Sequence, residues 1–305
     1  MRGQVILVFG TVCLDRIRRI KTLPEPGGYA EVREEHEMLG GEAANTASAL
    51  TLWRVEVALA GNGLGLGFES ERLRMLVLEK GISDDLLTNE GATPICEVYV
   101  ADDGDRTMFG RGIRGMTPAF PLVALPYERG MWFTAESNMR EASREAAHRA
   151  HAAGMRVYTM DFHHEDDQSP PGSIAQFSTD WVGGRGGVER NLGWIESWAK
   201  RHASTGILTD GAAGLYVGYP DRRARHYPAF PAPVVVDSTG AGDVFRAGVL
   251  YCLSTGCELG DALAFGSAAA SLKVGSLGGN EGIPTKEEVE AHLAAHPAIA
   301  GAYRF

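Results

Sequence analysis

The chain has 305 residues and a formal net charge of −10 at pH 7, with 29 Lys and Arg against 39 Asp and Glu. This excess of acidic residues argues against nucleic acid or an anionic membrane surface as a partner, because both bind through clusters of positive charge. An apolar fraction of 44% and a charged fraction of 22% exclude a disordered chain and provide enough apolar side chains for a substantial core.

The first third of the chain contains one strongly apolar strand and two polar segments. Residues 5–9 (VILVF) form a continuous run of β-branched and apolar residues, which predicts a central strand buried on both faces. Residues 15–38 and 95–111 are polar, and each contains a turn sequence (PEPGG and DDGD), which predicts exposed antiparallel ribbons. Because such ribbons do not fit inside a buried parallel sheet, we expect them to form a small β-lid. Helices are predicted at 42–54 and 68–81, and a further strand at 55–60.

Strands and helices alternate through the rest of the chain. Strands are predicted at 131–134, 156–160, 206–209, 215–218 and 234–236, and helices at 139–153, 192–202, 241–254, 259–273 and after Pro284. Residues 163–190 match neither pattern, because prolines and a glycine-rich run interrupt them. Alternation of this kind indicates an α/β fold, a single domain over residues 1–305 with a mainly parallel sheet between two layers of helices.

Residues 234–248 (VVVDSTGAGDVFRAG) carry the strongest functional pattern. Small residues lead from the predicted strand directly into a helix, so the N–H groups of residues 240–242 would be unpaired at the helix N-terminus and could bind a phosphate group. Asp243 lies in the first turn of that helix, where a carboxylate beside a phosphate is costly unless it takes a proton from an attacking hydroxyl. Asp237, at the end of the strand, could hold a cation or orient the loop. Helix capping is the structural alternative for either acid alone, but the whole string favours a phosphate site.

This string resembles the C-terminal signature of the ribokinase-like, or phosphofructokinase-B-type, carbohydrate kinases. Four other sequences match motifs of the same family in order and spacing. They are GTVCLD at 10–15 and GGEAAN at 40–45, which resemble its sugar-binding motifs, and TDGAAG at 209–214 and GGNEGIP at 278–284, which resemble its nucleotide-binding loops. The resemblance covers residues 4–295 and implies a three-layer α/β/α fold with a β-lid over the sugar.

The resemblance also implies roles for individual residues. Asp243 would be the general base, and the backbone of Gly240, Ala241 and Gly242 would form an anion hole for the transferred phosphoryl group. The sugar would be held by Asp15, Gly41 and Asn45, with further contacts from Glu136, Arg106 and Arg111. ATP would be bound at Thr209, Gly211, Gly214, Gly242 and Gly278, with Mg²⁺ arriving on the nucleotide. Asp237 and Thr239 would border a site for a monovalent cation such as K⁺, with Gly278 across from them.

These roles predict an ATP-dependent sugar kinase that phosphorylates a hydroxyl, expected to be primary, of a small carbohydrate. A nucleoside kinase of the same fold is the first alternative, and a non-catalytic sugar- or nucleotide-binding regulator is the second. The regulator gains weight because the Asn-x-x-Glu motif that the family associates with Mg²⁺ and phosphate is absent before Thr209. The resemblance further implies a homodimer that forms through the lid. The four cysteines include no Cys-x-x-Cys pair, so reduced thiols in a cytoplasmic protein are expected.

Overall fold

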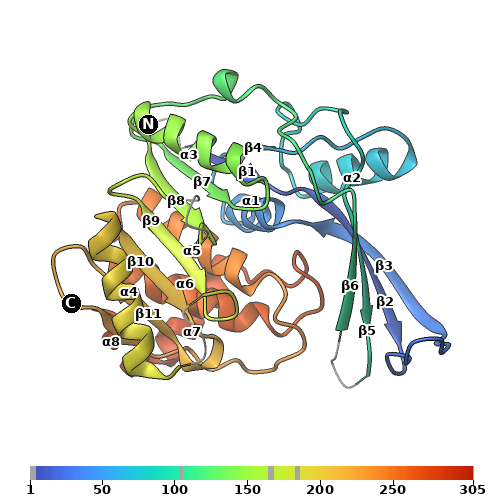
Figure 1. Ribbon diagram of the computed structural model, residues 1–305. Coiled ribbons are helices and arrows are strands. Elements are labelled where there is room, and N and C mark those ends of the chain that lie inside the picture. Colours follow the sequence, from blue (N-terminus) through green and yellow to red (C-terminus); the bar gives the residue numbers. More distant parts are fainter. Residues whose placement is uncertain (1–4, 103–105, 164–167, 183–185, 305) are drawn as a thin grey trace.

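A computed structural model describes residues 5–102, 106–163, 168–182 and 186–304 (Figure 1). In this part of the chain an eight-stranded sheet has the order β12-β11-β10-β9-β8-β7-β1-β4. The strands from β10 to β4 are all parallel, and β11 and β12 are added antiparallel at one edge. Their bounds are β1 Ile6–Gly10, β4 Val57–Gly61, β7 Trp132–Glu136, β8 Arg156–Met160, β9 Ile174–Ser178, β10 Thr205–Thr209, β11 Leu215–Gly218 and β12 Arg225–Tyr227.

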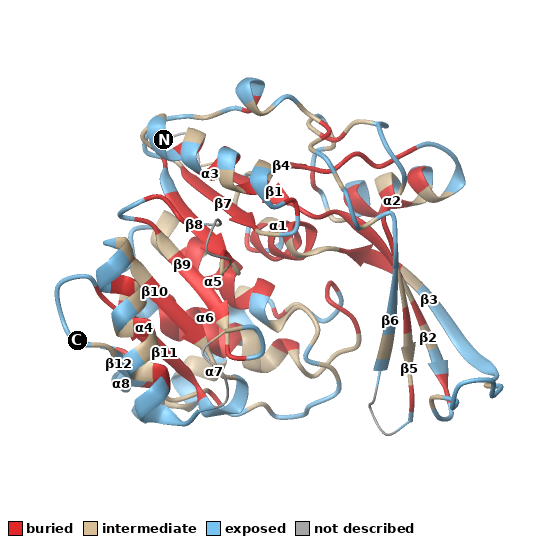
Figure 2. Cartoon of the chain, in the orientation of Figure 1, coloured by how far each residue is buried: buried red, intermediate tan, exposed pale blue. Residues whose placement is uncertain are grey.

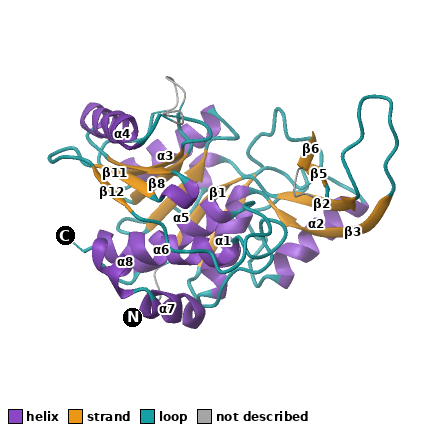
Figure 3. Cartoon of the chain, turned by 90° about the horizontal axis from the view of Figure 1, so that it is seen from below, coloured by secondary structure: helices purple, strands orange, loops and turns teal. Residues whose placement is uncertain are grey.

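Helices cover both faces of this sheet, so the domain has three layers (Figure 3). One face carries α3 (Glu141–Ala152) and α4 (Val188–His202). The other carries α1 (Glu42–Leu52), α5 (Ala241–Ser254), α6 (Leu259–Lys273), α7 (Lys286–Ala295) and α8 (Pro297–Ala302). The sheet and the helices α1, α5 and α6 are the most buried elements (Figure 2), and their apolar side chains form the main core. The three-layer α/β/α architecture expected from the sequence is therefore confirmed. Two short 3₁₀ helices, Leu122–Ala124 and Gly211–Ala213, lie in loops.

A second, four-stranded sheet projects from the sheet edge near β4 (Figure 1). Its order is β3 (Val32–Gly40), β2 (Cys13–Ile20), β5 (Ile95–Val100) and β6 (Arg106–Arg111), and α2 (Phe68–Glu79) packs against β2 and β3. We call these four strands the lid sheet. It is built from the two segments that the sequence marks as polar ribbons, although residues 103–105 of the second turn lie outside the described part. Ile17, Met38 and Val98 form a small cluster in this sheet, and Leu277 of the C-terminal half packs against it.

Most predicted elements are found within two residues of their expected ends, but one prediction is wrong. Residues 234–236 are not a strand, and the three valines are 52–74% exposed. The N–H groups of Val236 and Asp237 both donate to the carbonyl of Val274, so this segment is held against the end of α6 and joins no sheet. The pattern was misleading because three β-branched residues indicate an extended backbone but do not specify a partner.

Three elements had no predicted counterpart. The strand β9 lies between the proline pair and the glycine run, which hid it, and β12 and α8 are only three and six residues long. The N-terminus of α7 does follow its sequence pattern, since Thr285 and Glu288 form the reciprocal hydrogen bonds of a capping box. Among the described residues, no helix combines the length and hydrophobicity needed to cross a membrane.

Candidate active site

The candidate site lies where the parallel strands of the main sheet end, beside β1. Chain order reverses there, because β4 lies on one side of β1 and β7 on the other, and α/β sheets bind ligands at such a point. Thr11, directly after β1, donates through its N–H and its hydroxyl to Oε1 of Glu136, at 2.6 Å for the hydroxyl. The backbone N–H of Asn138 donates to Oε2 of Glu136 at 2.5 Å. Both carboxylate oxygens of Glu136 are thus engaged by the chain, and this residue fixes the turn after β1.

Asp243 lies in the first turn of α5 and is buried at 5% exposure. Its Oδ2 accepts a hydrogen bond from Nδ2 of Asn45 at 2.8 Å, and its Oδ1 lies 3.5 Å from Nη2 of Arg246. Burial raises the pKa of Asp243 to about 6, although Arg246 and the Asn45 amide oppose that rise. A carboxylate with this pKa is ionised at neutral pH and basic enough to accept a proton from a positioned hydroxyl.

Arg246 is one of the residues at this site that the sequence analysis missed, together with Glu42 and Asp161. It lies one turn after Asp243 with no exposed surface, and donates to the hydroxyl of Thr46 at 3.0 Å and to the carbonyl of Glu42 at 2.7 Å. Its Nη1 has no hydrogen-bond partner among the described residues. The sequence does contain one indication of this role, because Arg246 is the one basic residue in the mostly apolar helix α5, which begins next to Asp243.

Two further acidic residues share this environment. Burial raises the pKa of Glu42 well above its usual range, with added repulsion from Glu136 and Asp243. Burial likewise raises the pKa of Asp161, directly after β8, to about 6. Asp161 has a positive φ of 57°, and its Oδ1 is buried without a hydrogen-bond partner in the described structure. In the described structure, Oδ1 of Asp161 is therefore a hydrogen-bond acceptor without a partner, and Nη1 of Arg246 is a donor without a partner. Both residues lie near the carboxylate of Asp243.

The lid sheet contributes Asp15 to this site. Asp15 is buried on β2, accepts a hydrogen bond from the Cys13 thiol at 3.2 Å, and has a pKa raised to about 6 by burial and by the charge of Asp243. A side chain at Gly40 would overlap the Asp15 carboxylate, and one at Gly41, whose φ is 97°, would overlap the carbonyl of Thr11. The paired glycines therefore leave room for Asp15 beside the start of α1, from which Asn45 reaches Asp243.

The loop that starts α5 has the geometry of an anion site, with one difference from expectation. Gly240 has a φ of 78°, and any side chain there would overlap the backbone of Gly279, so only glycine fits. The N–H of Ala241 is already engaged by the carbonyl of Ser238 at 3.2 Å. The donors that remain for an anion are therefore those of Gly240 and Gly242, and the Gly242 carbonyl is held by Nε2 of Gln176 at 3.1 Å.

Asp237 and Thr239 lie in the segment before this loop. Oδ1 of Asp237 accepts from the N–H of Thr239 at 2.9 Å, from its hydroxyl at 2.7 Å and from Nη1 of Arg106 at 2.7 Å. Oδ2 accepts from the N–H of Gly278 at 2.8 Å. Burial alone would raise the pKa of Asp237, but these hydrogen bonds and the Arg106 charge outweigh it and lower the pKa. Arg106 thus joins the lid sheet to the C-terminal half.

The remaining predicted residues divide into two groups. Thr209 ends β10, and the turn after it has positive φ at Gly211 (51°) and Gly214 (98°), closed by a 2.8 Å hydrogen bond from Asp210 N–H to the Gly214 carbonyl. This turn lies at the same edge of the sheet as Asp243. Arg111 is not brought to the site: it is exposed and pairs with Glu69 of α2 at 3.1 Å.

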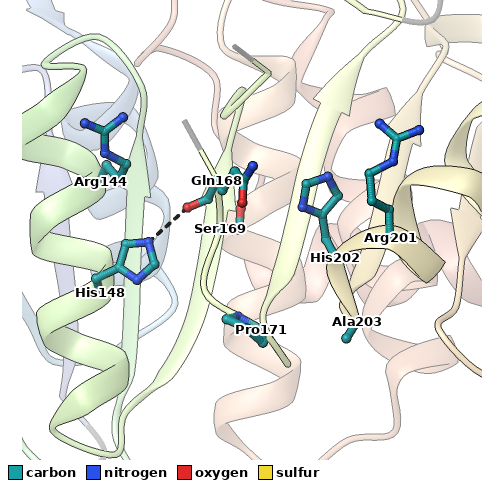
Figure 4. Close-up of a pocket in the computed structure, with 8 residues that line it drawn as sticks. All are labelled: Arg144, His148, Gln168, Ser169, Pro171, Arg201, His202 and Ala203. Atoms are coloured by element: carbon teal, nitrogen blue, oxygen red, sulfur yellow. Dashed lines mark hydrogen bonds between the residues drawn. The ribbon is translucent and has the colours of Figure 1, made fainter. Parts of the chain in front are cut away.

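A separate hollow of about 520 Å³ lies between α3 and α4 (Figure 4). It is lined by Arg144 and His148 of α3, by residues that precede β9, and by Arg201 and His202 at the end of α4. These residues lie on the face of the sheet that α3 and α4 cover, whereas Asp243 belongs to α5 on the other face. The hollow is therefore not part of the candidate active site.

Comparison with known proteins agrees with this geometry. Residues 188–286 match the model of the pfkB family of carbohydrate kinases. The chain is 30% identical to the uncharacterized sugar kinase YegV of Escherichia coli K12, over 97% of this chain and 95% of that protein. It is 23% identical to a nucleoside kinase of Methanocaldococcus jannaschii, over 96% and 98%. The structure of Arabidopsis thaliana ribokinase complexed with ribose and ATP superposes with a TM-score of 0.77 at 18% identity, covering 96% of this chain and 99% of that one.

The main sheet is mostly parallel, the loop before α5 lies at its switch point, and a separate β-sheet lies beside it. Together with the comparisons, these features identify a ribokinase-like kinase. The chain belongs to the pfkB family of carbohydrate kinases. It is accordingly a phosphotransferase with an alcohol group as acceptor, a sugar or nucleoside kinase.

Mg²⁺ is the metal ion that a kinase of this family implies. In the described part of the chain, no group of three or more His, Cys, Asp or Glu side chains is arranged to hold a metal ion. The absence of the Asn-x-x-Glu motif agrees with that finding. The residues present therefore do not fit a protein-only Mg²⁺ site, and a metal ion would have to take most of its ligands from the nucleotide phosphates.

Proposed function

We propose that the chain transfers the γ-phosphoryl group of ATP to a hydroxyl of a small carbohydrate, with Asp243 as the general base. The observation that carries this proposal is the hydrogen bond between Asn45 and Asp243. It places a sugar-binding type of side chain from the N-terminal half against the carboxylate at the N-terminus of α5. Asp243 would take the proton of the attacking hydroxyl, and the N–H groups of Gly240 and Gly242 would stabilise the charge on the phosphoryl oxygens.

The sugar would bind between Asp15 of the lid sheet and the edge of the main sheet. Asp15 and Asn45 can hydrogen-bond neighbouring hydroxyls. The unpaired Oδ1 of Asp161 and Nη1 of Arg246 supply one further acceptor and one further donor, and a buried polar atom without a partner favours a ligand that pairs it. The lid sheet would exclude water, and the turn at Thr209, Gly211 and Gly214 together with Gly278 would border the nucleotide.

The charges at the site favour an acceptor that is not yet phosphorylated. The charge of Asp243 adds to the rise in the pKa of Asp15, and the charge of Asp161 adds to that of Asp243. Arg246 is the cation that opposes the rise for both Asp161 and Asp243. On the lid sheet, Arg16 and Arg18 pair with Glu37 and Glu35 at 2.8 Å each. A phosphosugar would add negative charge to an acidic pocket, whereas a neutral polyol would not.

A coupled ADP-release assay with ribose, fructose, 2-keto-3-deoxygluconate, adenosine and inosine tests the proposed function. Phosphorylation of one of the sugars supports it, and phosphorylation of the nucleosides alone would instead establish the nucleoside kinase alternative. Binding of a sugar without ADP formation across the panel would establish the regulator.

The acid limb of the pH profile should report on Asp243. Its pKa is raised to about 6, so the base is ionised above that pH and protonated below it. We expect kcat to be constant above pH 7 and to fall roughly tenfold per pH unit well below pH 6. Initial rates at saturating ATP and acceptor between pH 4.5 and 8.5 measure this, with circular dichroism to confirm folding. A profile that stays flat down to pH 5 would contradict the assignment.

Arg106 should influence acceptor binding by holding the lid sheet against the C-terminal half. The ion pair with Asp237 is partly exposed, so its loss is worth at most about 1 kcal/mol, or roughly a fivefold change. We expect Arg106→Met to raise KM for the acceptor by about that factor, with the effect shrinking at high salt. Arg33→Met is the matched control, because Arg33 pairs with Asp102 at 2.9 Å within the lid segments. Equal effects of the two substitutions would show that Arg106 does not hold the lid.

We also propose a homodimer that forms through the lid sheet. The edge strands β3 and β6 have no further strand paired to them in the described structure, and Met108 and Phe109 on β6 are 56% and 58% exposed. Sedimentation equilibrium tests this, with Phe109→Glu as the variant expected to shift the protein to monomer.

A further inference from the structure

One cation lies fully buried beside the proposed phosphate loop. Lys273, the last residue of α6, has no exposed surface. Its Nζ donates to the carbonyl of Gly278 at 2.7 Å and lies 3.4 Å from the carbonyl of Ser276. A buried ammonium group is retained only where fixed oxygens and negative charge compensate for lost hydration. The carbonyls supply the oxygens. Burial lowers the pKa of Lys273, and the nearby charges of Asp237, Glu281 and Asp243 oppose that lowering.

The ammonium group of Lys273 and the carboxylate of Asp237 both bind the backbone of Gly278. Lys273 binds the carbonyl of Gly278, while Oδ2 of Asp237 accepts from the N–H of Gly278 at 2.8 Å. The residue after Lys273, Val274, accepts hydrogen bonds from the N–H groups of Val236 and Asp237. Lys273 is therefore fixed beside the loop that leads into Gly240, and Gly240 is itself in close contact with Gly279.

The same place is where a monovalent cation was expected, bordered by Asp237 and Thr239 with Gly278 opposite. The residues present do not fit such an ion. The Asp237 carboxylate already accepts from Thr239, Gly278 and the Arg106 guanidinium, and the Gly278 carbonyl is bound by the ammonium group. A K⁺ ion needs several oxygens in place of its hydration shell, and here those oxygens face donors and a positive charge.

We propose that the ammonium group of Lys273 takes the place of a bound monovalent cation, so that this kinase needs no K⁺ for activity. The proposal rests on the proposed function for its catalytic readout, but the structural claim concerns the loops around Gly278 and Gly240. The group that organises these loops is then part of the chain, held by the carbonyls of Gly278 and Ser276. Their geometry should therefore not depend on the salt in which the protein is dissolved.

The first test compares the purified protein in KCl, NaCl and tetramethylammonium chloride at equal ionic strength. Tetramethylammonium is too large to enter a site between carbonyls. We expect rates that agree within about twofold and an unchanged melting temperature, since no cation binds. Activation by K⁺ of more than about tenfold, or a melting temperature that K⁺ raises above that in tetramethylammonium, would overturn the proposal. The melting temperature needs no turnover, so it decides the question even if no tested sugar is phosphorylated.

The second test creates the missing cation site. Lys273→Ala removes the ammonium group and leaves space beside the Gly278 carbonyl, whereas Lys273→Met removes the charge and fills the space. We expect Lys273→Ala to be inactive in tetramethylammonium chloride, to recover in KCl or NH₄Cl, and to melt roughly 2–4 °C higher in those salts. Lys273→Met should not recover.

Lys286→Ala, which loses an exposed pair with Glu290, is the control expected to behave as wild type. Equal behaviour of the Ala and Met variants in all salts would contradict the inference. If both fail to fold, the salt comparison on the wild-type protein still decides it.

Discussion

Asp243→Asn is expected to lower kcat by about 10²–10⁴-fold while leaving the fold intact. The substitution keeps the size of the side chain but replaces the basic carboxylate with an amide, which does not take a proton from a hydroxyl near neutral pH. The amide can still contact Asn45 after rotation, and removal of a buried carboxylate near Asp15 relieves repulsion. We therefore expect KM for ATP to change little and thermal stability to stay the same or rise. Steady-state kinetics and a thermal melt measure both.

The matched control for this substitution is Asp261→Asn. Asp261 lies on the exposed side of α6 and pairs with Arg304 at 3.5 Å, far from the phosphate loop, so its replacement should leave kcat unchanged. Turnover near the wild-type value in Asp243→Asn would remove Asp243 from the role of base.

Arg246→Met is expected to have the largest effect on stability, a loss of about 3–5 kcal/mol. Arg246 is fully buried and compensates for the charges of Asp243 and Asp161. Without it, two buried carboxylates must either remain ionised without a cation or take up protons. The pKa of Asp243 should rise, so the acid limb of the kcat profile should move to higher pH. Urea denaturation and the pH profile measure the two effects.

Two controls separate the charge of Arg246 from its size. Arg246→Lys keeps the charge and should leave the pH profile near that of the wild type, even though it loses the hydrogen bonds to Thr46 and Glu42. Arg149→Met breaks an exposed pair with Glu145 on α3 and should cost no more than about 0.5 kcal/mol. If Arg246→Met cost as little as Arg149→Met, the acidic cluster would not depend on this guanidinium.

The sequence predicts best those parts of the molecule in which a local pattern determines the geometry. The glycine at 240 is required by positive φ and by the contact with Gly279, so its motif marks the loop reliably. The alternation of elements predicts the three layers, and the capping box predicts where α7 begins. The polar segments identify the lid sheet because strands such as β2 and β3 carry several charged residues, whereas the strands of the main sheet carry few.

The sequence predicts poorly those parts that depend on which partner a residue meets. Residues 234–236 have strand composition but join no strand in the described structure, and the Val236 N–H donates to the Val274 carbonyl at the end of α6. Arg246 and Lys273 look like surface residues of helices, yet both are fully buried. Arg246 donates to the distant Glu42 carbonyl, and Lys273 donates to the Gly278 carbonyl in the loop that follows its own helix. Arg111 was expected at the sugar, but its position on β6 directs it to Glu69. Glu42, Glu69 and Val274 are distant in sequence from the residues they meet, and periodicity does not show that the loop after α6 folds back over Lys273.

The hydrogen bond between Asn45 and Asp243 joins residues 198 positions apart and has a consequence for the order of folding. The buried side chains of α1 pack against α5, so during synthesis this face of α1 stays exposed to water until the C-terminal third has emerged. Contacts this distant in sequence form slowly, and the incomplete chain displays apolar surface meanwhile. The helix that covers this face of α1 is also the helix that carries the proposed base and phosphate loop. A chain that lacks α5 therefore has both an uncovered α1 and no working site.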